Sequence, residues 1–338
     1  MGSDSTYFFQ PGVKSRKNPL TPESNVVLTR KFARYHAEAL DAIGTLYYNE
    51  EGFDDFYYGK GSTYPDVHGA VGILFEQASS RGHLRESIHG EFDFAYTIRN
   101  QVRTSLSTLA AANDLRVELL RHQAEFYRSA HALADEKPIG GYLFGNTADP
   151  ASVHAMVELL LRHANEVRPL LEDTDGFTAG SAFVVPARQP QFRLVQAMFE
   201  SRTTFEDTVF YDVSAWTIPL AMGVPYVELR GGLGVQVGEP VKTAEFPKAP
   251  KPKMSEVAYA FEWHGQFAPR ALGRVHDAEI LAKVTTRPIT AVTTDGQQRV
   301  LDRGTVVLPV GIQRGEAVDS MAPSMVYVWR TSVDDTHY

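Results

Sequence analysis

Six consecutive residues of low polarity, residues 70–75, end directly in the carboxylate of Glu76. A run of this length with glycines beside it is typical of a strand buried on both faces. Burying a lone carboxylate is costly unless the group is paired or has a chemical role. We therefore expect a core strand at 70–75 with Glu76 at its carboxyl end, where open α/β sheets place their sites. The alternative interpretation is a structural glutamate paired with Arg81 or Arg85.

Helical periodicity occurs on both sides of this run. Thr21-Pro22-Glu23 supplies a capping hydroxyl, a proline at the first helical position and an acid in the first turn, so it predicts a helix start. Apolar residues then recur at helical spacing over residues 28–46. A longer helical pattern covers about residues 97–134. Its expected core stripe is Leu106, Leu109, Leu115, Leu119 and Phe126.

The first credible domain boundary is Lys137-Pro138-Ile139-Gly140-Gly141. Beyond it, strands expected at 142–144, 182–185, 226–229, 258–263, 289–293 and 305–310 alternate with helical segments. This alternation favours an α/β class with a mostly parallel sheet. We expect one domain at residues 1–136 and a second at 137–338, with an exposed Lys/Pro-rich loop at 242–254.

Composition excludes several classes of function. With 33 Lys+Arg against 41 Asp+Glu, a net charge of −8 and no basic block, we expect no nucleic-acid partner. No stretch approaches 18 uninterrupted apolar residues, so we expect no membrane partner. The chain has no cysteine, which excludes disulfides, thiolate metal sites and cysteine nucleophiles.

The pattern H-x-x-E, which can bind zinc through both side chains, occurs four times. At least three copies lie on expected helices, whose polar faces contain such pairs anyway, and none has an obvious third ligand. We interpret all four as surface pairs or caps and predict no metal ligand among them. They are His83/Glu86, His122/Glu125, His163/Glu166 and His276/Glu279.

Two segments together resemble the zinc carboxypeptidase family, that of carboxypeptidase A and carboxypeptidase T. The first runs from Tyr7-Phe8-Phe9-Gln10-Pro11-Gly12-Val13 to Asn18-Pro19-Leu20-Thr21-Pro22. The second is Phe53-Asp54-Asp55-Phe56-Tyr57-Tyr58-Gly59-Lys60-Gly61-Ser62-Thr63-Tyr64-Pro65-Asp66, continued by Gly72-Ile73-Leu74-Phe75-Glu76-Gln77-Ala78-Ser79-Ser80-Arg81-Gly82. The resemblance implies the carboxyl-terminal part of a mixed-sheet peptidase domain, as found in large bacterial proteins. Residues 140–313 resemble the flavodoxin-like, glutamine amidotransferase-like α/β region that follows it in those proteins.

The resemblance also implies roles for individual residues. Glu76 matches the glutamate that acts as general base, and Tyr64 matches the tyrosine that closes over the terminal residue of a peptide or protein substrate. Family members bind zinc through an H-x-x-E pair and a later histidine, all of which precede the segment that matches Tyr7. We therefore expect the base without its metal: no zinc at the family site of this chain, and no activity alone.

Three hypotheses of function follow. The first is a fragment of a zinc metallocarboxypeptidase, a proteolytic hydrolase whose full-length relatives are usually exported to the periplasm or secreted. The second is a non-catalytic peptide- or protein-binding module built on a degenerate peptidase remnant. The third, hydrolysis by the second domain, is disfavoured because glutamine amidotransferases of that class use a cysteine nucleophile. Under the first hypothesis, the strands that would neighbour the core strand are missing. Their absence would expose apolar surface and make residues 1–135 prone to aggregate.

Overall fold

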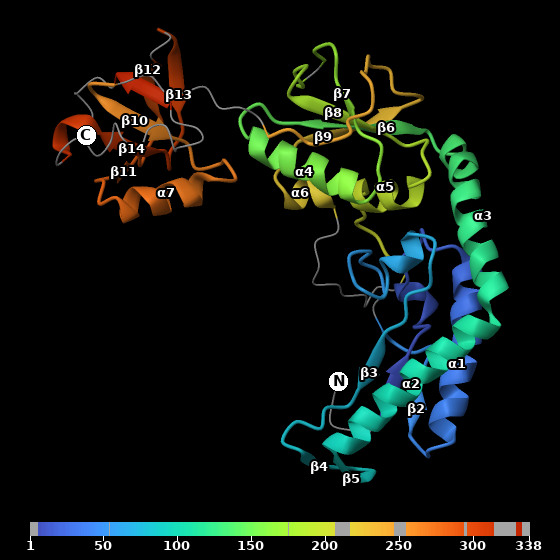
Figure 1. Cartoon of the computed structure of the whole chain (residues 1–338). Helices are drawn as coiled ribbons and strands as arrows, with labels where there is room; N and C mark the ends of the chain where they lie inside the picture. Colours follow the sequence, from blue (N-terminus) through green and yellow to red (C-terminus); the bar gives the residue numbers. More distant parts are fainter. Residues whose placement is uncertain are drawn as a thin grey trace. The chain divides into compact units, whose positions relative to one another are not determined.

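A computed structural model describes residues 6–53, 55–174, 176–206, 217–246, 255–293, 296–313 and 329–332. The chain is broadly α/β (Figure 1). It divides into two compact units. The first comprises Met1–Leu143, Ala164–Glu166 and Val184–Gln236, and the second comprises Phe144–His163, Val167–Phe183 and Val237–Tyr338. Within the described residues, no helix is both long and apolar enough to cross a bilayer.

The described helices are α1 Glu23–Asp41, α2 Phe94–Asp114, α3 Arg116–Asp135, α4 Pro150–Arg162, α5 Phe192–Phe199, α6 Ile218–Ala221 and α7 Ala268–Asp277, with short 3-10 turns η1 Lys14–Arg16, η2 Pro65–Val67 and η3 Val310–Ile312. The strands are β1 Tyr7–Phe9, β2 Tyr47–Tyr48, β3 Phe75–Gln77, β4 Leu84–Ser87, β5 Gly90–Asp93, β6 Ile139–Gly145, β7 Arg168–Pro169, β8 Ala182–Pro186, β9 Tyr226–Arg230, β10 Ala258–Phe261, β11 Lys283–Val284, β12 Ile289–Thr293, β13 Gln298–Leu301, β14 Val306–Pro309 and β15 Trp329–Ser332.

A three-stranded mixed sheet lies at the centre of residues 6–135. Its order is β2-β1-β3, with β1 parallel to β2 and antiparallel to β3. Tyr7 and Phe9 are fully buried on one face, where they pack against Ala33 and Leu40 of α1. Because side chains alternate along a strand, Phe8 points to the opposite face. This alternation divides the sheet into a helix-covered face and a second face that carries Phe8.

The helix expected after residue 22 is confirmed as α1, but its expected cap is wrong. The helix begins after Pro22, which occupies the cap position and whose carbonyl accepts from the amide of Asn25 at 3.0 Å. No side chain caps this end, so the Thr21 hydroxyl has no capping role.

The core strand expected at residues 70–75 is also wrong, because β3 begins only at Phe75. The preceding backbone donors bind side chains instead of a neighbouring strand. The amide of Gly72 donates to Asp66 Oδ1 at 2.8 Å, and the amide of Leu74 donates to Gln10 Oε1 at 2.6 Å. Buried polar side chains thus replace the sheet ladder that the apolar run predicted.

The long helical pattern at 97–134 is confirmed as helix, divided into α2 and α3 at Leu115, but its expected core stripe is largely wrong. Phe126 is buried, whereas Leu106 and Leu109 are 56% and 68% exposed. The buried face of α2 is instead Thr97, Asn100, Thr104, Ser107 and Ala111.

Polar groups on the sheet and on α1 explain why α2 buries its polar face and exposes Leu106 and Leu109. The Tyr7 hydroxyl lies 2.8 Å from Thr104 Oγ1, and His36 Nδ1 lies 2.7 Å from Ser107 Oγ. Asn100 donates to Gln77 Oε1 at 2.9 Å. A leucine in these positions would leave the buried polar groups without partners, which costs more than the apolar burial gains.

The strands expected beyond residue 137 are present as β6, β8, β9, β10, β12 and β14. One described sheet has the order β7-β8-β6-β9, and another has the order β11-β14-β10-β15-β12-β13. Every pairing in the six-stranded sheet is antiparallel, so the prediction of a mostly parallel sheet is wrong there. The connection between β12 and β13 is too short for the crossover that parallel strands require. Of the loop expected at 242–254, only 242–246 lie within the described residues.

Acid should destabilise the fold through His36, which is fully buried and lies edge-on against Phe9 and Phe75. Burial lowers the pKa of this imidazole from 6.5 to about 4. Between those two pH values the unfolded chain takes up a proton that the folded chain does not, so the free energy of unfolding falls as pH falls.

His36→Gln removes this titration and keeps a polar partner for Ser107. We expect it to flatten the acid-side loss, which is on the order of 1.4 kcal/mol for each unit of pKa difference. Urea unfolding between pH 4 and 7 measures the effect, with exposed His89→Gln as the control. A pH dependence identical to wild type in His36→Gln would contradict the assignment.

Candidate functional site

Glu76 lies in the middle of β3, directly opposite Phe8 of β1. Paired residues on neighbouring strands share a face, so Glu76 is on the side of the sheet opposite α1. Phe8 stacks on Phe53 at 4.6 Å between ring centroids and lies 5.3 Å from Tyr48. Burial is the largest cause of a raised pKa at the Tyr48 hydroxyl, and the nearby carboxylates of Glu51 and Glu76 raise it further. The predicted base is therefore half-buried on an aromatic surface, beside a tyrosine.

Two arginines were the alternative partners for this carboxylate. The Arg85 guanidinium donates to the carbonyl of Ser79 at 2.9 Å, and the backbone amide of Arg81 donates to Ser79 Oγ at 3.2 Å. Both contacts hold the turn that follows β3 and precedes the β4–β5 hairpin. The Arg85 side chain therefore has a structural use in the loop after Glu76, and Arg81 contributes its backbone amide to the same loop.

Tyr64, the predicted substrate contact, lies at the start of η2. Its ring stacks on His68 at 5.2 Å, and the Tyr127 hydroxyl donates to the His68 carbonyl at 3.0 Å. Burial is the largest cause of a raised pKa at the Tyr64 hydroxyl, and nearby Tyr127 raises it further. The structure thus brings Tyr64 together with His68 and α3, and Glu76 together with Phe8 and Tyr48.

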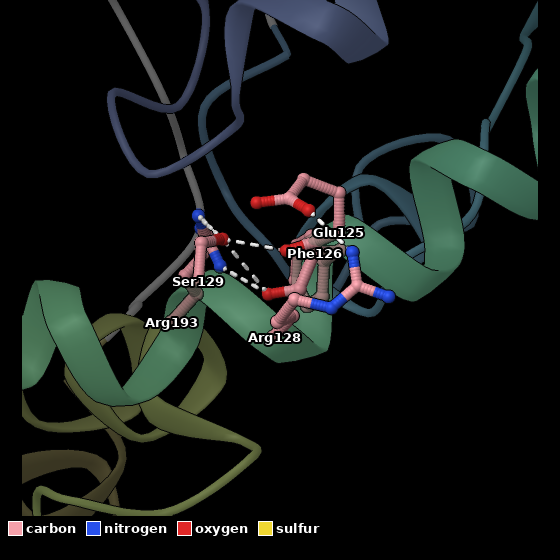
Figure 2. Close-up of polar contacts among 5 residues, drawn as sticks. All are labelled: Glu125, Phe126, Arg128, Ser129 and Arg193. Atoms are coloured by element: carbon pink, nitrogen blue, oxygen red, sulfur yellow. Dashed lines mark hydrogen bonds and ion pairs between the residues drawn. The ribbon is translucent and has the colours of Figure 1, made fainter.

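A buried arginine fixes the turn of α3 that contains Phe126 and Ser129 (Figure 2). Tyr127 lies in the same turn. Arg193 of α5 donates to the carbonyl of Phe126 at 2.8 Å and to Ser129 Oγ at 3.1 Å. Its guanidinium also lies 4.5 Å from the centre of the Phe126 ring. Hydrogen bonds and a cation–π contact offset the cost of burying this charge and hold α3 against α5.

Two buried aspartates, which sequence reasoning did not single out, form the main polar centre of the same unit. Asp55 is 6% exposed and Asp66 is 2% exposed. Thr63 donates to Asp55 Oδ1 at 2.5 Å, and Asn25 donates to Asp66 Oδ1 at 2.8 Å. We call these two carboxylates, with Lys17, Asn25 and Gln10, the acid network. They line a cavity of about 160 Å³ whose lining does not include Glu76 or Tyr64.

Burial dominates the electrostatics of the acid network. It raises the pKa of Asp66 from 3.8 to about 7, and the nearby charge of Asp55 adds to the rise. Burial also raises the pKa of Asp55 and lowers the pKa of Lys17, whose ammonium both carboxylates stabilise. Asp66 therefore titrates near neutral pH, where an ordinary aspartate is already ionised.

The acid network also holds the two segments that carry the sequence-predicted site residues. Asp66 and Gln10 bind the amides of Gly72 and Leu74, just before Glu76. Asp55 binds the hydroxyls of Ser62 and Thr63, just before Tyr64. The only signal in the sequence is that Asp55 and Asp66 lie in residues 47–69, a segment rich in aromatic residues and glycine. Nothing in their spacing predicts burial.

The structure also bears on the H-x-x-E pairs. His122 is 6% exposed and lies 3.0 Å from Ser24 Oγ through Nδ1, so the interpretation of a surface pair is wrong for this copy. Its partner Glu125 forms an exposed ion pair with Arg128 at 2.9 Å. Within the described residues there is no group of three or more His, Cys, Asp or Glu side chains that could hold a metal ion.

Raising the pH should destabilise the fold through Asp66, the reverse of the His36 effect. The folded pKa of about 7 exceeds the unfolded value of 3.8. The stability that protonated Asp66 contributes is therefore fully present below pH 4 and is lost as pH rises toward 7. Asp55 and Lys17 are the charged groups that face this carboxyl.

Asp66→Asn keeps an acceptor for Gly72 and Asn25 but cannot ionise. We expect a gain in the free energy of unfolding at pH 7, by a few kcal/mol at most, and a smaller difference at pH 4. Urea midpoints at both pH values test this, with exposed Asp41→Asn as the control. Equal destabilisation at both pH values would show that Asp66 does not titrate in this range.

The chain matches no family model, no curated protein and no solved structure.

Proposed function

We propose that this chain carries the base-bearing part of a zinc carboxypeptidase, in which Glu76 accepts a proton from the water that attacks the last peptide bond of a substrate. The observation that carries the proposal is the placement of Glu76. It is a half-buried carboxylate on the sheet face opposite α1, on a strand whose entry is fixed by buried hydrogen bonds. A general base must be held in place to accept a proton efficiently, and this strand supplies that constraint.

Tyr64 would contact the terminal residue of the peptide in this proposal. Its support is the anchoring of the preceding residues, because Thr63 and Ser62 both donate to the buried carboxylate of Asp55. The stack on His68 orients the Tyr64 ring, and its hydroxyl can donate to a peptide oxygen.

Zinc needs a donor set that the described residues do not provide. A catalytic zinc takes three protein ligands and an open position for water, and no such group occurs among the described residues. Peptide hydrolysis would require zinc ligands outside the described residues, and we expect the chain by itself to be inactive.

The proposal extends to architecture. Residues 1–136 would be the carboxyl-terminal portion of a mixed-sheet peptidase domain, which the mixed β2-β1-β3 sheet supports. Residues 137–338 would be an amidotransferase-like α/β domain, which the alternation of β6, α4, β8 and α5 supports.

A second candidate function is a non-catalytic peptide- or protein-binding module. The lack of a three-ligand group among the described residues favours it. Binding of a peptide with a free carboxyl terminus would select this function if its last residue is not released, whether or not zinc and a complementary carboxypeptidase segment are present.

Glu76→Gln tests the base. The chain is mixed with zinc and with a separately expressed carboxypeptidase segment that carries an H-x-x-E pair and the later histidine, and release of the terminal amino acid is measured. We expect the wild-type mixture to release it and Glu76→Gln to lose at least about 10²-fold in turnover with unchanged zinc content, because an amide cannot accept the proton.

Glu91→Gln is the matched control, since Glu91 is an exposed carboxylate in the β4–β5 hairpin of the same unit. Near-wild-type hydrolysis by Glu76→Gln would reject Glu76 as the base. No hydrolysis by any folded mixture would reject the peptidase proposal as a whole.

A further inference from the structure

A cavity of about 870 Å³ lies within the second compact unit, apart from the residues that the peptidase proposal uses. Its walls include the loop between β6 and α4, the loop between β10 and α7, one side of α7, and β13. Small-molecule sites in proteins are clefts of roughly 300–1,000 Å³ that combine an apolar lining with a few polar groups. The cavity therefore has the size of a site for a small organic molecule.

Three arginines from two elements line this cavity. The apolar side of α7 packs on the six-stranded sheet, where Val275 shares a buried cluster with Tyr259. Arg270 and Arg274 are one helical turn apart, so they lie on the same side of α7, and both line the cavity. Arg299 of β13 supplies a third guanidinium to the lining. A guanidinium has five N–H donors, so one local contact leaves donors for a ligand.

Two carboxylates also line the cavity, and each accepts a backbone amide. Asp149 is 7% exposed and accepts from the amide of Ser152 at 3.3 Å and from the amide of Gln266 at 2.9 Å, which ties the start of α4 to the loop before α7. Glu262 accepts from the amide of Asp302 at 3.5 Å. With three arginines against these two acids, the lining is formally positive in a chain of net charge −8, so it favours an anion.

Aromatic rings form part of the apolar lining. Phe246 and Phe267 both line the cavity, and their ring centroids are 5.8 Å apart. Phe246 also lies 4.9 Å from the ring of His154, yet it remains 43% exposed. A ring that neighbouring rings hold in place and that is still exposed offers a face for a flat ligand ring to stack on.

The chemistry of the lining favours a phosphate over a carboxylate as the anion. A single arginine can bind a carboxylate through two parallel hydrogen bonds. A terminal phosphate has three strong acceptor oxygens and up to two negative charges, so several arginines can share it. A nucleoside monophosphate combines such a phosphate with a flat base.

We propose that this cavity binds a nucleoside monophosphate, with the phosphate on Arg270, Arg274 and Arg299 and the base against Phe246 and Phe267. The inference does not rest on the peptidase proposal. It rests on the size of the cavity, on the excess of arginines in its lining and on the exposed aromatic ring beside them.

Isothermal titration calorimetry of the full chain tests the proposal, with the common ribonucleoside monophosphates and their nucleosides as probes. We expect at least one monophosphate to bind with a dissociation constant below about 100 μM, and at least about tenfold more tightly than its nucleoside, which lacks the anion. Failure of every monophosphate to meet both criteria would overturn the proposal.

Arg270→Glu tests the contact with the phosphate. Arg270 is exposed, so we expect the variant to fold, which circular dichroism checks. It should weaken binding of the monophosphate at least about tenfold, because the new carboxylate repels the phosphate. Arg287→Glu is the matched control, because Arg287 is exposed in the same unit and outside the lining. Equal affinities of the two variants would overturn the assignment.

Phe246→Ala tests the contact with the base. We expect it to weaken binding of the monophosphate at least about fivefold, because stacking on the base is lost, and to leave binding of ribose 5-phosphate unchanged. An equal change for both ligands would overturn the placement of the base. Tighter binding of benzoylglycine, a carboxylate with an aromatic ring, than of every monophosphate would overturn the choice of phosphate.

Discussion

The carboxylate of Asp66 is the contact on which the fold of residues 6–77 depends. One of its oxygens accepts hydrogen bonds from Asn25 of α1 and from the amide of Gly72. The bonds join the first helix to the segment that leads into β3. A buried acceptor shared by two segments is expensive to leave unsatisfied, so the aspartate fixes the path of the chain between them. The position of Glu76 on the sheet follows from that path.

Much of the fold could be predicted from the sequence, because periodicity is a direct record of which residues alternate between core and solvent. It gave α1, the helical region of α2 and α3, and most strands beyond residue 137. It failed where buried polar groups replaced apolar contacts. The segment 70–74 is apolar like a strand, yet its amides bind Asp66 and Gln10. Such side-chain partners come from distant positions, and no local pattern reveals them.

The candidate site could be predicted only in part for the same reason. Glu76 was visible because a charge ends an apolar run, and Tyr64 because of the segment around it. Asp55 and Asp66 lie in that same segment, but their burial depends on Lys17 and Asn25, which lie some forty residues earlier in the chain. The Leu106 and Leu109 prediction failed because hydrophobicity alone does not say which side of a helix meets a polar partner.

Gly72 limits which substitutions and insertions the candidate site can accept. A Cβ atom there would lie 1.8 Å from the carbonyl oxygen of Ser62, so the two backbones touch with no room for a side chain. The segment that carries Tyr64 and the segment that leads to Glu76 are therefore in direct backbone contact. A shift of either one must be transmitted to the other through backbone contact. Insertions near Ser62 or substitutions at Gly72 would alter both ends of the candidate site at once, so these two segments can diverge in sequence only together.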